Sequence, residues 1–510
     1  MTSNSPTIRR TGASSQALVY GIASLAVIGL LGWLLMGIGG EDDGPDELVL
    51  YCAAGIQKPV AEAVQQYQEE TFGIPVRIQY GGSGTLLANL QTAKTGDLYL
   101  AADISYMDIA REKGVLAETI PLAVQRPVIA VKKGNPKKIR SIADLLRPEV
   151  KFALANPDAA SIGKLTRKVL TTTGEWDAVK ARVKVFKPTV NDIITDVEVG
   201  SVDAAVVWDA NVAQKSDTLD AVHTKAFDAA KKTVTIGVLK WTQSSAKALQ
   251  IARYLQAPEK GQKVFEKYGY ETLPDADHWA IKPTIHISSG GVNRVAIQQT
   301  LKEFQAREGI DLIVKYNGCG IIVGEIKGGD RPDAYFACDA SFMVQVQDKF
   351  HESLILSETD MVIIVPKDNP KNIAALKDLT QSGLRVGVTN PKQSALGELT
   401  RKLLKSVGLL QAVEKNISVR TPTADMLVNG LRGHALDAAI VYRANVSQIK
   451  DEVHVIAINE GRSKAVQPIA IGKESKYPHL VQRLVDALRS DLSRNRFKSA
   501  DFRWLLQESK

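Results

Sequence analysis

The second half of this 510-residue chain repeats the motifs of its first half in the same order. Five pairs of segments correspond: 80–85 with 316–321, 97–103 with 333–339, 134–137 with 368–371, 156–167 with 390–401, and 203–208 with 437–442. The offset is 236 residues between positions 80 and 316 and 234 residues between positions 208 and 442. A solenoid would repeat about every 20–50 residues, so this long and nearly constant offset predicts duplication of a whole domain.

The duplication divides most of the chain into two similar domains. We expect the first over residues 47–280 and the second over 284–510, with Pro283 in the junction between them. Each copy is long enough to bury its own hydrophobic core. The formal net charge is +8, and no run of Lys and Arg is interleaved with aromatic residues, which argues against a nucleic-acid partner.

An uncharged segment near the N-terminus predicts a membrane anchor. Residues 17–38 contain no charged side chain, and this length of helix spans a bilayer of about 30 Å. Arg9 and Arg10 precede the segment, so the positive-inside rule places the tail 1–16 in the cytoplasm. A short linker, 39–46, then leads to two domains in the periplasm or extracellular space. The alternative is a cleaved signal peptide, whose apolar region is usually shorter.

The sequence of each copy alternates between strand and helix patterns. In the first copy, short apolar strands are expected at 48–51, 75–80 and 97–101, with helical spacing between them. This order predicts an α/β fold in which helices cover a parallel sheet. Ligands of such sheets bind at the carboxyl ends of the strands, where the helices begin.

The predicted junctions between strand and helix carry hydrogen-bond donors. Gly55 and the segment Ser83-Gly84-Thr85 fall at predicted helix N-termini, where free backbone N–H groups and the helix dipole favour an anion. The hydroxyl groups of Ser83 and Thr85 add further donors. The alternative is ordinary helix capping, in which Ser and Thr bond to their own chain. The segment is not a P-loop, because no Lys followed by Ser or Thr occurs at the required spacing.

Several motifs of each copy together resemble a known family. In the first copy they are Ala53-Ala-Gly55, Tyr80-Gly-Gly-Ser83-Gly-Thr-Leu86, Asp97-Leu-Tyr-Leu-Ala-Ala-Asp103, Asn156-Pro157 and Asp203-Ala-Ala-Val-Val-Trp208. Their order resembles that of the molybdate-binding proteins of ABC transporters, which are type II periplasmic binding proteins. The resemblance implies two α/β lobes per domain that close on a tetrahedral oxyanion such as molybdate, tungstate or sulfate. It also implies no cofactor, no catalysis, and an ABC permease as a partner, which the residues themselves do not show.

The family's ligand-binding positions can be carried over to each copy. In the first copy they fall on Gly55, Ser83, Ile162, Val190 and Trp208; in the second they fall on Gly291, Cys319, Leu396, Ala424 and Tyr442. Gly55 and Trp208 depart from the serine and tyrosine of the family pattern. The second copy keeps the tyrosine, but it has Cys319 in place of Ser83 and Ile321 in place of Thr85. A thiol is a weak donor, so the first copy is expected to bind more tightly.

Three cysteines occur, Cys52, Cys319 and Cys338, with no spacing typical of zinc or redox motifs. We interpret them as small buried thiols. A disulfide between Cys319 and Cys338 is compatible with a location outside the cytoplasm, but spacing alone does not establish it.

Two other functions are compatible with parts of the sequence. An enzyme would need a catalytic group, yet none of the seven histidines has the spacing of a triad or a metal site, and His434 is interpreted as a surface turn residue. Paired carboxylates, Asp97 with Asp103 and Asp333 with Asp339, recur in both copies, which favours a structural role. The second alternative is an anchored sensor or assembly module in which one or both copies have lost or changed their ligand.

Overall fold

The computed structural model describes residues 47–460 and 463–506, which form one compact unit. The expected tail, anchor and linker lie outside the described residues. Within the described ranges, no helix combines the length and the apolar character needed to cross a bilayer. The core clusters of the described chain separate into those of residues 48–270 and one of residues 285–502, so each copy has its own core.

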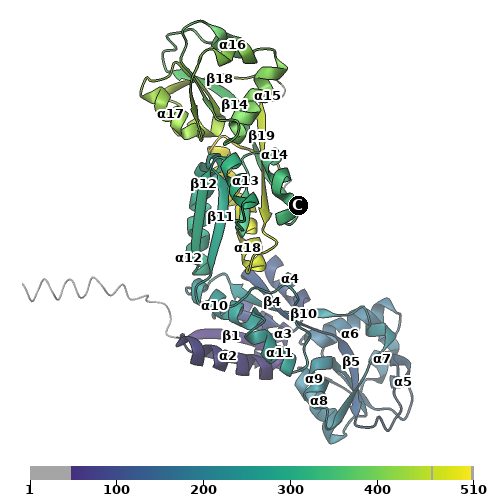
Figure 1. The fold of residues 1–510 in the computed structure, drawn as a ribbon. Coiled ribbons are helices and arrows are strands. Elements are labelled where there is room, and N and C mark those ends of the chain that lie inside the picture. The colour runs from purple at the N-terminus through teal and green to yellow at the C-terminus, as the bar shows by residue number, and fades with distance from the viewer. Residues whose placement is uncertain (1–46, 461–462, 507–510) are drawn as a thin grey trace, which may run out of the picture. The chain divides into compact units, whose positions relative to one another are not determined.

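The first domain consists of two α/β lobes, and the second lobe is inserted into the first (Figure 1). The outer lobe has the strand order β2-β1-β3-β10-β4: β1 (Leu48–Ala53), β2 (Val76–Gly81), β3 (Leu98–Ala101), β4 (Leu116–Gln125) and β10 (Lys232–Leu239). Its α-helices are α2 (Gln57–Thr71), α3 (Ser83–Ala93), α4 (Ile104–Glu112), α10 (Ser245–Gln256) and α11 (Gly261–Lys267). The inserted lobe has the order β7-β6-β8-β5-β9: β5 (Pro127–Lys132), β6 (Phe152–Ala155), β7 (Val185–Lys187), β8 (Ala204–Trp208) and β9 (Leu219–Val222). Its helices are α5 (Ile142–Leu145), α6 (Ser161–Thr172), α7 (Trp176–Arg182), α8 (Val190–Val199) and α9 (Asp209–Ala213).

The second domain repeats this plan. Its outer lobe contains β11 (Thr284–Gly290), β12 (Asp311–Asn317), β13 (Ala334–Phe336), β19 (Lys464–Ile471) and β20 (Arg503–Trp504), with α12 (Arg294–Glu308), α13 (Cys319–Lys327), α14 (Ala340–Met343), α18 (Pro478–Arg489) and α19 (Asp491–Ser499). Its inserted lobe contains β15 (Val386–Thr389), β16 (Ile417–Thr421), β17 (Ala438–Tyr442) and β18 (Val453–Ala457), with α15 (Ala395–Ser406), α16 (Leu410–Glu414) and α17 (Ala424–Arg432). Strand β14 (Leu354–Pro366) pairs with strands of both lobes.

The two copies differ at the crossing between their lobes. In the first domain the crossing strand is divided into β4 and β5, which end and begin on either side of Arg126. Pro127 follows this break, and proline has no N–H to donate to a ladder. In the second domain position 361 is methionine, and β14 runs through without interruption, so its two sheets join into one. The crossing strand is therefore continuous in the second copy and divided in the first.

The sequence correctly predicts the parallel part of each sheet. Strand β1 pairs in parallel with β2 and with β3, and β11 pairs in parallel with β12 and with β13. Strands β10 and β4 are antiparallel additions that the alternation of strand and helix did not predict. They arise because the chain returns from the inserted lobe to complete the sheet of the outer lobe.

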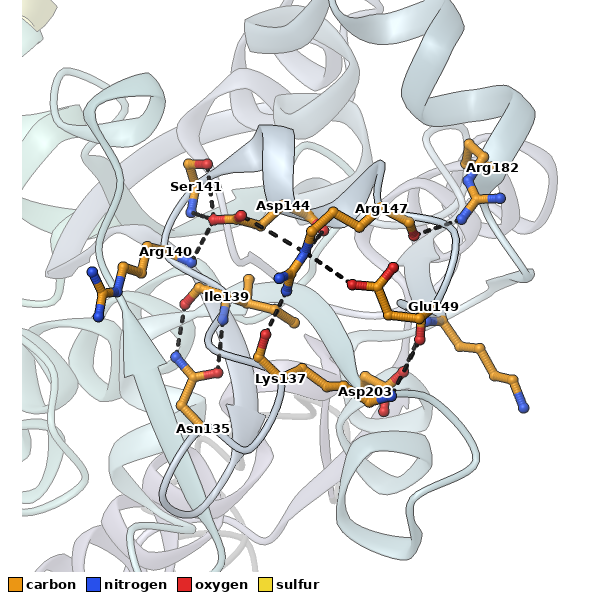
Figure 2. A network of polar contacts seen from close by, with 11 residues as sticks. Asn135, Lys137, Ile139, Arg140, Ser141, Asp144, Arg147, Glu149, Arg182 and Asp203 are labelled. Atoms are coloured by element: carbon orange, nitrogen blue, oxygen red, sulfur yellow. Dashed lines mark hydrogen bonds and ion pairs between the residues drawn. The ribbon is translucent and has the colours of Figure 1, made fainter.

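The repeated Asn-Pro-Lys motif builds a loop of the inserted lobe (Figure 2). Asn135 has a positive φ of 48° and its side chain bonds both ways with the backbone of Ile139, at 2.7 and 2.9 Å. Asn369 repeats the arrangement in the second copy with Ile373, at 2.8 and 3.0 Å. In the first copy Asp144 then accepts N–H bonds from Arg140 and Ser141, as the figure shows. This motif recurs because it shapes a loop.

The recurring carboxylates also have structural partners. Asp97 accepts the backbone N–H of Val49 at 2.8 Å, and Asp333 accepts that of His286 at 2.8 Å. Asp103 caps α4 through the N–H of Ser105. Asp339 caps α14 in the same way. These bonds account for the recurrence of both pairs without a catalytic role.

A buried cluster of charges connects the two domains. Glu308, at the end of α12, has no exposed surface and receives two hydrogen bonds from Arg483, at 3.1 and 2.9 Å. Arg253 of the first domain reaches the same carboxylate at 3.2 Å and is 3% exposed. Asp277 of the first domain accepts the N–H groups of His479 and Leu480 at the start of α18. The domain boundaries stay a prediction, and these contacts show that the copies also share polar partners.

Candidate functional site

The N-termini of three helices meet at one small pocket between the lobes of the first domain. The pocket is lined by Ala53, Ala54, Gly55, Gly81, Gly82, Ser83, Ala102, Ala160, Ser161, Ile162, Thr189, Val190 and Trp208. All five positions selected in the first copy, Gly55, Ser83, Ile162, Val190 and Trp208, are among them. Ser83 begins α3, Ser161 and Ile162 begin α6, and Val190 begins α8. The structure thus brings these residues together, and their ligand-binding role stays a prediction.

The hydroxyl of Ser83 is held in place by its neighbours. Its Oγ accepts the hydroxyl of Ser161 at 2.8 Å and the backbone N–H of Ala102 at 3.3 Å, and the side chain is 2% exposed. A serine oxygen that accepts two bonds still has its own proton to donate. Because both accepted bonds come from fixed groups, that proton is oriented before any ligand arrives.

The backbone amides at the start of α6 are also available. Asn156 forms an Asx turn through the N–H of Asp158, at 2.9 Å, and the turn leads the chain into the helix. The residue before the helix, Ala160, has no side chain that can cap it. The first N–H groups of the helix, including those of Ser161 and Ile162, therefore lack intrahelical partners at the pocket.

The two lobes touch directly beside the pocket. The N–H of Gly84 donates to the carbonyl of Ala159 in the other lobe at 2.9 Å. A Cβ at Gly82 would lie 2.4 Å from the same carbonyl oxygen and 2.8 Å from that of Pro188. Only glycine permits this approach, so the structure corresponds to a closed arrangement of the lobes.

No charged side chain lines this pocket. The nearby acidic residues are occupied elsewhere: Asp192 forms a capping box with Thr189, and Asp158 pairs with Arg167 at 3.0 Å. Asp209 accepts N–H groups of the backbone at Arg126 and Ala210. These carboxylates therefore bond to their own backbone or to an arginine side chain. The first pocket offers neutral donors only, an environment that suits an anion whose oxygens all accept.

The pocket is small. The cavity has room for a group of about 3 Å radius. A central atom with four oxygens around it has about this size. A nucleotide or a sugar would require the lobes to separate.

The second domain has an equivalent pocket with a different lining. It consists of Gly291, Val292, Asn317, Gly318, Cys338, Ser394, Leu396, Pro422, Thr423, Ala424, Asp425, Tyr442 and Asn445. Four of the five selected positions, Gly291, Leu396, Ala424 and Tyr442, belong to it. The fifth, Cys319, does not line it.

The interpretation of Cys319 and Cys338 as free thiols is wrong. The two sulfurs form a disulfide, and only Cys52 is a free buried thiol in the described chain. The backbone N–H of Cys338 lies 3.0 Å from the sulfur of Cys319, in the position of the bond between Ala102 and Ser83 in the first copy. The disulfide thus replaces the hydroxyl contact, and the cysteine has no proton to donate to a ligand.

The second pocket gains two other polar groups. The Tyr442 hydroxyl lies in a side chain that is 3% exposed, and it has no hydrogen-bond partner within the described residues. Burial raises the pKa of Tyr442 well above its ordinary value, so its phenol stays a neutral donor. Asp425 is the second residue of α17 and lines the pocket, and its carboxylate accepts the side-chain N–H of Asn445 at 3.1 Å. Partial burial raises the pKa of Asp425, opposed by Asn445 and by the charge of Arg294.

Sequence reasoning missed some groups and placed one wrongly. Thr85 was expected to add a donor, but its side chain is exposed and lies outside the first pocket. The equivalent residue of the second copy, Ile321, also lies outside its pocket. Thr189, Ser394, Asp425 and Asn445 were missed. Each of the four lies within three residues of a position that had been selected, so inspection of the flanking residues would have found them.

Comparisons with known proteins match each copy separately. The sequence model of the family described as bacterial extracellular solute-binding protein matches residues 48–271 and again 285–503. The molybdate-binding protein ModA of Mycobacterium bovis is 27% identical over 232 residues, which are 45% of this chain and 87% of that protein. YvgL of Bacillus subtilis, a lipoprotein assigned as an ABC transporter substrate-binding protein, is 30% identical over 227 residues, 44% of this chain and 85% of that protein. Among solved structures, the periplasmic molybdate-binding protein of Azotobacter vinelandii is 18% identical with a TM-score of 0.38, covering 44% of this chain and 99% of that one.

Proposed function

Because the chain belongs to the bacterial extracellular solute-binding protein family, as a tandem pair of molybdate-binding-protein-like domains, we propose that it captures a tetrahedral oxyanion outside the cytoplasm. Molybdate and tungstate are the foremost candidates, and an ABC permease would receive the bound ion. The observation that carries this proposal is the first pocket, where oriented neutral donors converge without a charged side chain.

The donor set favours an oxyanion without protons. Molybdate, tungstate and sulfate present four accepting oxygens, which the Ser83 hydroxyl and the free amides of α3, α6 and α8 match. Hydrogen phosphate also carries an O–H group. No carboxylate lines the first pocket to accept the hydrogen bond of that group. A buried polar group without a partner costs about 1–3 kcal/mol, so phosphate should be discriminated against in this pocket.

The proposal is tested by calorimetric titration of the full chain with molybdate, tungstate, sulfate and phosphate. We expect saturable binding of at least one of the first three anions in the micromolar range or tighter. Absence of binding for all four would contradict an oxyanion function. It would favour the anchored sensor or assembly module instead, for which the loss of the hydroxyl at Cys319 is the supporting observation.

Replacing Ser83 with alanine should weaken oxyanion binding by about 1–3 kcal/mol, because a buried charged oxygen loses a hydroxyl donor. The N–H of Ala102 and the hydroxyl of Ser161 would also lose an acceptor, so a smaller loss of unfolding free energy should accompany it. Titration and thermal unfolding of the same preparation separate the two effects. Unchanged affinity with reduced stability would mean that the Ser83 hydroxyl serves only to bridge Ser161 and Ala102.

We further propose that the uncharged segment 17–38 anchors the chain in the membrane with both domains outside. The disulfide of the second domain supports an oxidising compartment, because such bonds are rare in the cytoplasm. A tagged chain should stay in the membrane pellet after alkaline extraction, and protease added outside should release both domains. Recovery of a soluble mature form that begins near residue 41 would identify the segment as a cleaved signal peptide.

A further inference from the structure

The two pockets differ in one chemical property that their shared fold does not require. The first pocket is lined by residues without charge, whereas Asp425 is among the residues that line the second. The position equivalent to Asp425 in the first copy is Asn191, whose side chain donates to the carbonyl of Ala54. The fold therefore accepts an uncharged residue here, and the carboxylate is specific to the second copy.

The second pocket is lined by a residue that can donate, Tyr442, and by one that can accept, Asp425. Tyr442 comes from the end of β17, and its buried hydroxyl has no protein partner within the described chain. Asp425 comes from the start of α17, and Asn445, which also lines the pocket, orients its carboxylate. The charge of Arg294 opposes the rise in the pKa of Asp425 and so favours the ionised carboxylate, which can accept an O–H.

The hydroxyl donor that Ser83 gives the first pocket is missing here. Ser83 is replaced by Cys319 in its disulfide, and Ser161 is replaced by Ala395. A fully deprotonated oxyanion would find no proton donor in the place of Ser83, and the carboxylate of Asp425 would repel it. An oxyanion that keeps one proton would instead donate its O–H to that carboxylate, a charge-assisted bond of the stronger kind.

We propose that the second pocket binds a monoprotonated tetrahedral oxyanion, of which hydrogen phosphate is the representative, with Asp425 accepting its O–H and Tyr442 donating to an unprotonated oxygen. This inference rests on the proposed oxyanion function and extends it: the two copies divide protonated and unprotonated oxyanions between them. Sulfate and hydrogen phosphate are the decisive pair of probes, because at mildly alkaline pH they have the same shape and charge and differ by one proton.

The test is calorimetric titration of the full chain with each anion. The wild-type chain should bind phosphate, and saturating molybdate should leave that binding intact because it occupies the first pocket. Asp425→Asn, which keeps the shape and the contact with Asn445, should weaken phosphate binding by about tenfold or more and leave molybdate binding unchanged. Asp368→Asn is the matched control, since Asp368 is exposed in the same domain and the change removes the same charge.

The outcomes separate this inference from the function on which it rests. Molybdate or sulfate binding without phosphate binding would overturn the inference alone. Complete displacement of phosphate by molybdate, or equal effects of Asp425→Asn and Asp368→Asn, would overturn it as well. Binding of no anion at all would overturn the proposed function. Thermal unfolding of both variants checks that each is folded.

Discussion

Replacing Glu308 with alanine is expected to lower the free energy of unfolding by about 3–5 kcal/mol. The carboxylate is completely buried and bonds to Arg483 within its own domain and to Arg253 from the other. Removing it leaves two guanidinium groups in a site with little water. Burial already disfavours the charged form of Arg253 and lowers its pKa to about 10. The loss comes mainly from these unpaired charges.

Glu303 provides the matched control, because it lies on the same helix and also pairs with an arginine. Its side chain is 45% exposed, and its bond to Arg496 is 2.6 Å long. An exposed pair of this kind contributes about 1 kcal/mol or less, so Glu303→Ala should have a small effect. Urea unfolding of both variants measures the difference. Equal losses of unfolding free energy in the two variants would show that the buried Glu308 cluster stabilises the fold no more than an exposed ion pair does.

The same cluster makes the free energy of unfolding depend on pH. Burial opposes the ionisation of Glu308, but Arg483 and Arg253 outweigh it and hold its pKa below the ordinary value. A carboxylate of this kind stabilises the folded state above the pKa of the unfolded chain, about 4.3, and the contribution disappears as pH falls through the lower pKa of the folded state. The wild-type chain should therefore lose stability with acid in this range more steeply than Glu308→Gln, which has no such group to titrate.

The repeat explains why so much of the fold could be predicted from the sequence. The short strands at 48–51, 75–80 and 97–101 depend on local pattern, and all three are present in the structure. The charge cluster could not be predicted, because Glu308 is separated from Arg253 by 55 residues and from Arg483 by 175. Nothing in the local sequence distinguishes these residues from solvated charges.

The candidate site shows the same limit on a smaller scale. Motif order brought Ser83, Ile162 and Trp208 to one pocket correctly, since each lies where a strand ends or a helix begins. The pattern cannot say which way a side chain points within such a turn. Thr85 follows Ser83 by two residues on α3 and therefore faces outward. Likewise, the spacing of Cys319 and Cys338 could not show that their sulfurs form a disulfide between the start of α13 and the residues after β13.

Replacing Gly82 with alanine is expected to weaken ligand binding in the first domain by about 3 kcal/mol or more, roughly a hundredfold. Gly82 has φ −68° and ψ 141°, which any residue adopts, so its own lobe should fold normally. The added Cβ would instead meet the backbone oxygens of Ala159 and Pro188, at 2.4 and 2.8 Å. Backbone atoms cannot turn aside as a side chain does. The methyl group should therefore hold the lobes apart and leave the donors of α3 too far from those of α6 and α8.

Two controls identify the cause of that loss. Gly318→Ala places the same obstacle in the second copy, 2.2 Å from the carbonyl of Gln393, and should leave the first pocket unaffected. Gly324→Ala adds a Cβ that meets nothing within 4 Å and should change neither pocket. Because the obstruction exists only when the lobes are closed, Gly82→Ala should reduce affinity far more than unfolding free energy. Small-angle scattering should show no further compaction when molybdate is added to this variant. Wild-type affinity in Gly82→Ala would mean that the lobes bind their ligand without the close approach seen here, and the free amides of a single lobe would then suffice.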